Sequence, residues 1–316
     1  MNRRVLGKTG LEISVVGYGA SPLGAVYGVF REQDGIDAVH TALDGGVNFI
    51  DVSPYYGATT AETVLGKALR GIARAGYVLA SKVGRYGDAE FDFSAEGVTR
   101  SVHESLARLG TNYLDLVQCH DIEFVDLDQV IDETLPALRA LQQAGTVRAV
   151  GVTGYPLPAL AYVAERAEID TVMSYCQYTL QDRRLAAWRD RFDELGVAVI
   201  NASPLGMGAL TTRGAPAWHP AAPEVLERCA AAAAACAARG SDIAELALAF
   251  SVSTGPFAST VIGSADPANV RASLDWAQQT PDPNLLREVE QILAPVRDRG
   301  WVNGRPENQR PGGGAL

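Results

Sequence analysis

The chain has 316 residues, of which 47% are hydrophobic and 20% are charged, a balance typical of a globular protein and unlike that of a disordered one. The formal net charge of -10 and the lack of a dense run of Lys and Arg exclude nucleic acid as an expected partner. No apolar stretch approaches the roughly 20 residues that span a bilayer, and the polar start is unlike a signal peptide. We therefore expect a cytoplasmic protein that binds neither nucleic acid nor membranes.

The opening stretch VLGKTGLEISVV predicts a β-hairpin that turns at Lys8–Gly10. Short β-branched runs then recur along the chain and predict eight strands. These runs are ISVVG from 13, VNFID from 47, YVLASK from 77, YLDLVQCH from 113, VRAVGVT from 147, VMSY from 172, VAVINAS from 197 and STVIG from 259. Amphipathic stretches separate them, with helix starts predicted at Ser94 and at Asp128.

Strands that alternate with helices are usually parallel, and eight such pairs predict a closed (β/α)8 barrel, the TIM barrel. An open doubly wound sheet is the alternative. It is disfavoured because no G-x-G-x-x-G motif follows the first strand, where Gly17 and Gly19 lack the third glycine. We expect residues 1–300 to form one barrel whose N-terminal end is plugged by the hairpin. Residues 301–316, rich in Pro, Gly and polar residues, are expected to be a disordered tail.

The four cysteines show no C-x-x-C spacing, which predicts reduced thiols and neither a disulfide framework nor a zinc site. They are Cys119, Cys176, Cys229 and Cys236. Asp121 and Glu123 place two carboxylates shortly after His120, but a third metal ligand is missing from this pattern. No metal is therefore expected.

Polar side chains end three consecutive predicted strands, the place where TIM barrels carry their active sites. The second strand ends in Asp51 and is followed by Tyr56, the third ends in Lys82, and the fourth ends in His120. A carbonyl carbon that accepts a hydride also needs a proton on its oxygen, which a phenol of lowered pKa can supply. We expect Lys82 to lower the pKa of Tyr56, Asp51 to hold Lys82 charged, and His120 to bind the substrate oxygen.

Each of these four residues alone has an ordinary structural explanation as a cap, a packed ring, a solvated amine or a core histidine. Their joint occurrence at neighbouring strand ends favours chemistry instead. The pattern predicts an oxidoreductase that moves a hydride between a nicotinamide cofactor and a carbonyl or carbinol carbon of a small substrate.

The motifs D-V-S-P-Y-Y-G, S-K-V-G and D-L-V-Q-C-H resemble the aldo-keto reductase family, and the late S-P-L-G segment at 203–206 extends the resemblance over most of the chain. Members of this family are (β/α)8 barrels that bind NAD(P) across the barrel mouth. The resemblance implies that the family's catalytic tetrad corresponds to Asp51, Tyr56, Lys82 and His120.

Further stretches, among them G-A-S-P-L-G, F-D-F-S, C-H-D-I-E-F and S-Y-C-Q-Y, resemble a branch of the family that oxidises sugars such as L-galactose and L-fucose. This resemblance implies an NAD(P)-dependent aldose 1-dehydrogenase, which converts C1 of the sugar to a lactone. An NADPH-dependent carbonyl reductase with the same tetrad and a non-catalytic, cofactor-binding regulatory subunit stay open as alternatives. The expected partner is a small-molecule substrate, and the expected state is a monomer or a small homo-oligomer.

The family's cofactor-binding positions also have counterparts in this chain. They are Gly19, Ala20, Ser21, Asp51, Thr153, Tyr175, Ser203, Leu205, Gly206, Gly208, Gly263, Ser264 and Asn269. Many NADPH-using relatives carry Ser-Asn where this chain has Thr153-Gly154, Gln where it has Tyr175, and Tyr where it has Ala202. The usual amide partner of the nicotinamide carboxamide is therefore missing, and Gln177 or a backbone group is expected to substitute for it, with Tyr175 as the stacking aromatic.

NADPH-specific members commonly place Lys and Arg where this chain has Gly263 and Asn269, so the resemblance implies that NAD is preferred over NADP. Asp266 would repel a 2′-phosphate, although Arg271 lies near enough in sequence to replace the lost charge.

A Pro-rich loop after the seventh predicted strand carries Trp218 and His219. We expect these two side chains either to line the sugar pocket, together with Tyr56 and His120, or to pin their own loop.

Overall fold

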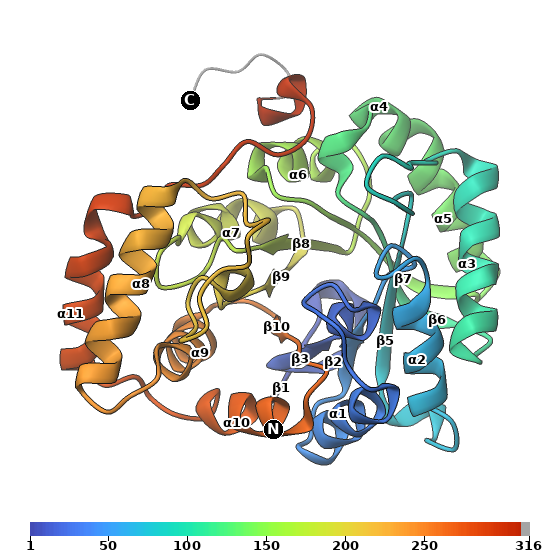
Figure 1. Ribbon diagram of the computed structural model, residues 1–316. Helices are drawn as coiled ribbons and strands as arrows, with labels where there is room; N and C mark the ends of the chain where they lie inside the picture. The colour runs from blue at the N-terminus through green and yellow to red at the C-terminus, as the bar shows by residue number, and fades with distance from the viewer. Residues whose placement is uncertain (311–316) are drawn as a thin grey trace.

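The computed structural model describes residues 1–310 of the chain. In this part of the protein, eight parallel strands close into a barrel in chain order, and the last strand pairs with the first (Figure 1). The barrel strands are β3 (Val16–Gly19), β4 (Phe49–Asp51), β5 (Val78–Val83), β6 (Leu114–Cys119), β7 (Val147–Thr153), β8 (Thr171–Tyr175), β9 (Ala198–Ala202) and β10 (Ser259–Ile262). The predicted barrel is confirmed, and the alternative of an open sheet is wrong.

The predicted N-terminal hairpin is also present, as the antiparallel pair β1 (Arg3–Val5) and β2 (Glu12–Ser14). Leu6 and Ile13 are fully buried in one cluster with residues of the barrel strands such as Phe49, Leu116 and Ile200, so the hairpin seals the barrel with apolar side chains. The sequence run from 13 to 17 is therefore split between two elements. Its first two residues belong to the hairpin, and the barrel strand begins only at Val16.

Helices surround the barrel (Figure 1). They are α1 (Glu32–Asp44), α2 (Thr60–Ala68), α3 (Ala95–Leu109), α4 (Leu127–Gln129), α5 (Leu135–Gln143), α6 (Leu157–Ala164), α7 (Arg184–Glu194), α8 (Pro223–Ala238), α9 (Ile243–Thr254), α10 (Pro267–Trp276) and α11 (Pro283–Leu293). Helices α8 and α11 pack against each other at the far left of Figure 1, and α1 packs against α10. No helix within residues 1–310 is both long enough and apolar enough to cross a membrane.

Helix α3 illustrates how local sequence sets these elements. Its start is capped as predicted, because the Ser94 hydroxyl accepts a hydrogen bond from the Gly97 amide at 3.1 Å. The helix predicted from Asp128 instead begins at Leu127, and its cap is Asp126, whose carboxylate accepts from the Asp128 amide at 3.0 Å. A π-helical turn over Val130–Thr134 then joins α4 to α5.

The C-terminal segment corrects one expectation. Residues 301–310 are packed onto the barrel mouth instead of being disordered: the Trp301 ring stacks on Tyr155 with centroids 4.3 Å apart, and Asn308 is buried. Asn308 Nδ2 donates to the backbone carbonyls of Glu123 and Val125. The composition of this segment shows few apolar residues, but it does not show that backbone carbonyls on the barrel accept hydrogen bonds from its polar side chains. The remaining part of the predicted tail, residues 311–316, lies outside the described residues.

Each of the four cysteines is buried and unpaired, as predicted for reduced thiols. Cys229 and Cys236 lie on the buried face of α8, where a thiol packs as a small apolar group.

Candidate active site

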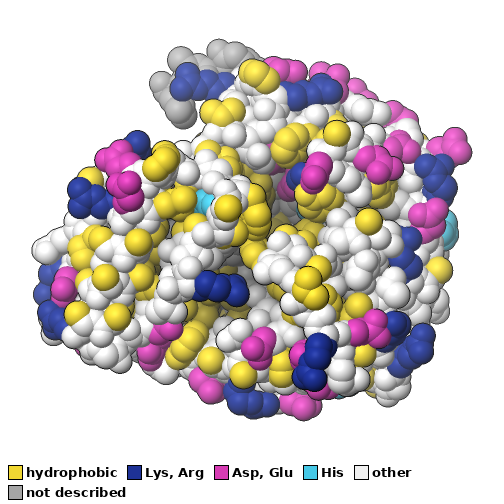
Figure 2. All heavy atoms as spheres, in the orientation of Figure 1, with side chains coloured by type: hydrophobic (Ala, Val, Ile, Leu, Met, Phe, Trp, Pro, Cys, Tyr) yellow, Lys and Arg dark blue, Asp and Glu magenta, His cyan; other side chains and the backbone are white. Residues whose placement is uncertain are grey.

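The four candidate catalytic residues come together at the C-terminal ends of β4, β5 and β6. Asp51 is the last residue of β4, Lys82 is the fifth residue of β5, and His120 directly follows β6. Tyr56 lies in the turn that leads from β4 to α2. Because parallel strands point the same way, these ends meet at one edge of the barrel, where Figure 2 shows the molecule hollowed near the centre of the face.

Lys82 is the centre of this cluster and is only 2% exposed. Its Nζ donates to Asp51 Oδ2 at 2.5 Å, to the Tyr56 hydroxyl at 3.1 Å and to the Val52 carbonyl at 3.1 Å. All three donor positions of the ammonium are thus satisfied without water. The arrangement holds the phenol oxygen of Tyr56 at a fixed distance from a buried positive charge.

The charges of this cluster follow from burial and from the neighbouring groups. Burial alone would lower the pKa of Lys82, but Asp51 and Tyr56 raise it above its usual value, so Lys82 is charged. Burial raises the pKa of Tyr56 to about 12, and the Lys82 ammonium opposes this only in part. Lys82 thus lowers the pKa of Tyr56 as expected, but desolvation of the phenolate outweighs this attraction, so the phenol does not have the net lowered pKa that was predicted.

His120 stands beside Tyr56, with the two rings edge to face and their centroids 5.6 Å apart. Burial, with Lys82 and Arg85 adding to it, lowers the pKa of His120 to about 3, so its imidazole is neutral. Ser53 Oγ accepts from the Tyr55 amide at 3.1 Å, and its own proton is free to bond His120 Nδ1 at 2.9 Å. We assign the imidazole proton to Nε2 on this basis.

Two positioning residues were not identified from the sequence. Ser53 fixes the His120 ring, as described above, and Gln118 Nε2 donates to Asp51 Oδ1 at 3.1 Å. Both obey the two-residue period of a strand, since Gln118 lies two positions before His120 and Ser53 two positions after Asp51. This two-residue period is the sequence feature from which both positioning residues could have been predicted.

A close approach of two loops also fixes Tyr56. A Cβ atom on Gly24 would lie 2.5 Å from the Tyr56 backbone, and a Cβ atom on Gly57 would lie 2.4 Å from the Gly24 carbonyl. Only glycine at both positions lets the turn after β3 pack directly on the backbone that carries the phenol.

An ion pair lies on the other side of His120. Asp121 Oδ2 is 2.5 Å from Arg85 Nη1 and 3.6 Å from His120 Nε2. The Asp121 amide donates to Thr153 Oγ1 at 3.1 Å, so Thr153, a candidate cofactor residue, also supports the turn after β6.

Gln177 and Tyr175, the residues expected to contact the nicotinamide, both make hydrogen bonds within the protein. Gln177 is buried and its Oε1 accepts from Ser174 Oγ at 2.8 Å, so its role as a substitute amide stays a prediction that rests on Nε2. The Tyr175 hydroxyl accepts from Asn303 Nδ2 at 2.9 Å, and Asn303 also donates to Glu123 Oε1 at 2.7 Å. Burial raises the pKa of Glu123 to about 8. The C-terminal segment thus contributes to this side of the mouth.

The remaining candidate cofactor residues lie around the barrel mouth. Gly19 on β3 pairs with Asp51 on β4, and the Ala20 amide donates to the Asp51 carbonyl at 2.8 Å. Ser21 is the next residue in the chain. Ser203, Leu205, Gly206 and Gly208 form the turn after β9. Their donors are backbone amides and hydroxyls, a set that suits the phosphates and ribose hydroxyls of a dinucleotide.

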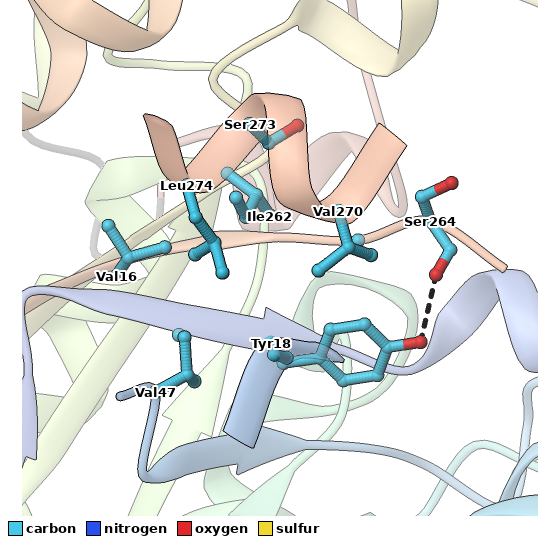
Figure 3. A pocket seen from close by; sticks show the side chains of 11 residues that line it. Val16, Tyr18, Val47, Ile262, Ser264, Val270, Ser273 and Leu274 are labelled. Carbon is cyan, nitrogen blue, oxygen red and sulfur yellow. Dashed lines mark hydrogen bonds between the residues drawn. The ribbon is translucent and has the colours of Figure 1, made fainter. Parts of the chain in front are cut away.

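The loop after β10 is tied to the first barrel strand (Figure 3). The Tyr18 hydroxyl donates to the Ser264 carbonyl at 2.9 Å, and the cavity beneath, about 10 Å³, has room for one water at most. A Cβ atom on Gly263 would lie 2.1 Å from the Gly19 carbonyl, so this position excludes any side chain. Asn269 lies exposed in the first turn of α10, which Asp266 caps by accepting from the Ala268 amide.

The two candidate sugar-binding residues of the Pro-rich loop differ from each other. Both nitrogens of His219 bond the backbone, Nε2 to the Gly206 carbonyl at 3.0 Å and Nδ1 to the Ala221 amide at 3.1 Å. His219 therefore pins its loop. Trp218 is 51% exposed and contacts Tyr27 from the loop after β3, with ring centroids 5.8 Å apart. Within residues 1–310 no group of three His, Cys, Asp or Glu side chains is arranged to hold a metal ion.

A barrel with a buried Asp–Lys–Tyr chain and a neutral histidine at its mouth defines an enzyme built to move a proton at an alcohol or carbonyl oxygen. The chain belongs to the Aldo/keto reductase family, whose model matches residues 15–294. The cofactor is therefore a nicotinamide nucleotide, NAD or NADP.

Several known proteins are similar to the chain. L-galactose dehydrogenase of Arabidopsis thaliana is 44% identical over 96% of this chain and 98% of its own length. D-arabinose 1-dehydrogenase of Saccharomyces cerevisiae is 35% identical over 76% of this chain and 75% of its own. Among solved structures, the holo form of an aldo-keto reductase from Bacillus halodurans is 27% identical, covers 98% of this chain and 99% of its own, and has a TM-score of 0.79.

Proposed function

We propose that this protein is an NAD(P)-dependent aldose 1-dehydrogenase that oxidises an L-galactose-like or L-fucose-like sugar at C1 to its lactone. The observation that carries the chemistry is the hydrogen bond from buried Lys82 to the Tyr56 hydroxyl, beside a neutral His120. The sugar is supported by the names of the relatives, which include a D-threo-aldose 1-dehydrogenase of a Pseudomonas species, 26% identical over 89% of this chain.

The mechanism follows from these contacts. A bound nicotinamide would supply the acceptor for the hydride that leaves C1. Tyr56, as the phenolate, takes the proton of the C1 hydroxyl at its own oxygen, and the Lys82 ammonium 3.1 Å away stabilises that phenolate. His120 Nε2–H donates to the same substrate oxygen and orients C1. Asp51 keeps Lys82 charged throughout.

We propose that the cofactor is held by backbone and hydroxyl donors of the loops after β3, β9 and β10, and that NAD is preferred. The support is the absence of a Lys or Arg side chain at Gly263, Ser264 and Asn269, together with the exposed carboxylate of Asp266. A 2′-phosphate would meet that negative charge. Arg271, in α10, is the cation that would have to compensate.

A second function is favoured by one observation. A phenol whose pKa is about 12 is protonated at neutral pH, which suits the same residues to donate a proton and to reduce an aldehyde or ketone with NADPH. A regulatory, non-catalytic role finds no support in a tetrad with these contacts. We also place the protein in the cytoplasm, as a monomer or a small homo-oligomer.

The deciding experiment is a substrate panel of L-galactose, L-fucose, D-arabinose and simple aldehydes, assayed with both cofactors in both directions. We expect lactone formation from at least one sugar with NAD⁺, at a kcat/KM above that for every aldehyde. Aldehyde reduction with NADPH and no sugar oxidation would replace the dehydrogenase with the reductase. No turnover in any arm, with cofactor still bound, would favour the regulatory role.

A further inference from the structure

The ion pair of Arg85 and Asp121 has no part in the proton chemistry described so far. Asp121 directly follows His120, its carboxylate lies 3.6 Å from His120 Nε2, and the side chain is only 9% exposed. Its backbone has φ of 51°, a left-handed conformation that a residue other than glycine adopts at a cost and that is found often at functional sites. The chain therefore directs this carboxylate at the place where the substrate oxygen must bind.

Arg85 is held as firmly as its partner. Its guanidinium lies 4.1 Å from the Tyr55 ring centroid and 4.9 Å from that of Phe124, and Nη2 donates to the Tyr55 hydroxyl at 3.2 Å. Tyr55 in turn donates to Asp88 at 2.8 Å. Stacking between rings fixes the plane of the guanidinium, so the pair is rigid before any substrate arrives.

A purely structural role, in which the ion pair only joins the loops after β5 and β6, does not explain where the pair lies. The stacked rings of Phe91 and Phe124, 5.4 Å apart, already join the loops after β5 and β6. The Asp121 charge moreover raises the pKa of Tyr56, which lowers the fraction of Tyr56 present as the phenolate that oxidation needs. A carboxylate retained at this place needs a benefit that outweighs that disadvantage.

The chemistry of the pair matches a hydroxyl group next to the reacting carbon. A substrate whose C1 oxygen binds His120 Nε2 would bring the hydroxyl at C2 close to the Asp121 carboxylate, which lies 3.6 Å from that nitrogen. A hydroxyl can donate to the carboxylate and accept from the guanidinium at once. Among residues 1–310, Asp121 Oδ1 takes part in no hydrogen bond, so one acceptor is available for it.

We propose that Asp121, with Arg85, binds the C2 hydroxyl of the substrate and makes the enzyme specific for substrates with a hydroxyl on the carbon beside the reacting one. The inference rests on the proposed aldose dehydrogenase activity for its choice of sugar. Asp121 and Arg85 are then specificity-determining residues for 2-hydroxy substrates.

The test compares L-galactose with 2-deoxy-L-galactose as substrates of the wild type and of Asp121→Asn. The wild type should prefer L-galactose by on the order of 10² in kcat/KM, since a charge-assisted hydrogen bond is lost with the 2-deoxy sugar. In Asp121→Asn that ratio should fall below about 10, because L-galactose loses the bond and the 2-deoxy sugar has none to lose.

Two outcomes would overturn the proposal. The first is an equal kcat/KM of the wild type for L-galactose and 2-deoxy-L-galactose, which would overturn the proposal before any variant is made. An equal loss on both sugars in Asp121→Asn, with an unchanged ratio, would show that Asp121 acts only through His120. The double variant Arg85→Met with Asp121→Ala leaves no unpaired buried charge and is the variant to assay if the single one folds poorly; its ratio should fall in the same way.

A matched control is Asp170→Asn, which breaks another buried ion pair, with Arg139 at 3.0 Å, away from the catalytic cluster. It should lower stability and leave the substrate ratio unchanged. If no sugar is oxidised, the dehydrogenase proposal fails by itself, and the same variants are assayed in the reducing direction with 2-hydroxypropanal against propanal. A preference for the 2-hydroxy aldehyde that Asp121→Asn abolishes supports the role of the pair, and no preference overturns it.

Discussion

Two sectors of the barrel mouth are organised in opposite ways. At the ends of β4, β5 and β6, charged side chains are buried and joined by direct contacts, from Asp51 through Lys82 to Tyr56. At the end of β10, the candidate adenosine loop carries no buried charge: Asp266 is exposed and caps α10, and the Tyr18 hydroxyl donates to the Ser264 carbonyl. The first sector is organised without any ligand, because an unpaired buried charge would be too costly. The second sector needs no protein partners before a ligand binds, because water satisfies the hydrogen bonds of its exposed groups.

The largest effect should come from Tyr56→Phe, which removes one hydroxyl from the organised sector. We expect kcat to fall by about 10²–10⁴, the range for a lost acid–base group, with folding and cofactor affinity preserved. Steady-state kinetics and fluorescence titration of the cofactor measure both. Tyr162→Phe on the exposed face of α6 is the control, and near-normal turnover of Tyr56→Phe would remove this residue from the chemistry.

Lys82→Met should affect both stability and activity. It leaves Asp51 as a buried charge without its partner, and breaking such a pair lowers the free energy of unfolding by about 3–5 kcal/mol. The phenol also loses the charge that lowers its pKa, so the pH optimum for oxidation should rise.

Denaturant unfolding and pH profiles test this variant. Lys67→Met, which breaks an exposed pair with Glu32, is the control and should change stability by less than about 1 kcal/mol. A loss in Lys82→Met no larger than in this control, or an unchanged pH profile, would show that the two sectors do not differ as described.

Cofactor selectivity tests the second sector. Lys at position 263 is not a usable change, because Gly263 has no room for a side chain. Ser264→Lys with Asn269→Arg should instead raise NADP⁺ affinity by about 10-fold to 10²-fold, the effect of new charge-assisted bonds, and leave NAD⁺ affinity nearly unchanged. Fluorescence titrations at fixed low salt measure both. Wild type that binds NADP⁺ as tightly as NAD⁺ would mean that a cation such as Arg271 already holds the phosphate.

The pH dependence of the wild type tests the first sector without any variant. Oxidation needs the Tyr56 phenolate, whose pKa is about 12, so the ionised fraction and kcat/KM should rise about tenfold per pH unit across the neutral range. His120, with a pKa of about 3, stays neutral and should add no inflection. An inflection near pH 6.5 would show that His120 titrates there and that its surroundings are less apolar than in the structure.

The sequence predicted the barrel, its plug and the four candidate catalytic residues that the structure brings together. Strand ends and residue type are local properties, and the alternation of strands and helices leaves few ways to fold. Tertiary structure decided the rest. Arg85 and Asp121 lie 36 positions apart, and only the closure of the barrel makes them a pair.

The net pKa of Tyr56 is likewise the difference between burial and the attraction of Lys82, and neither magnitude exists before the chain folds. Gly263 and the segment 301–310 teach the same point. Whether a side chain fits, or a polar segment finds acceptors, depends on atoms that the sequence places far away and the fold brings within contact.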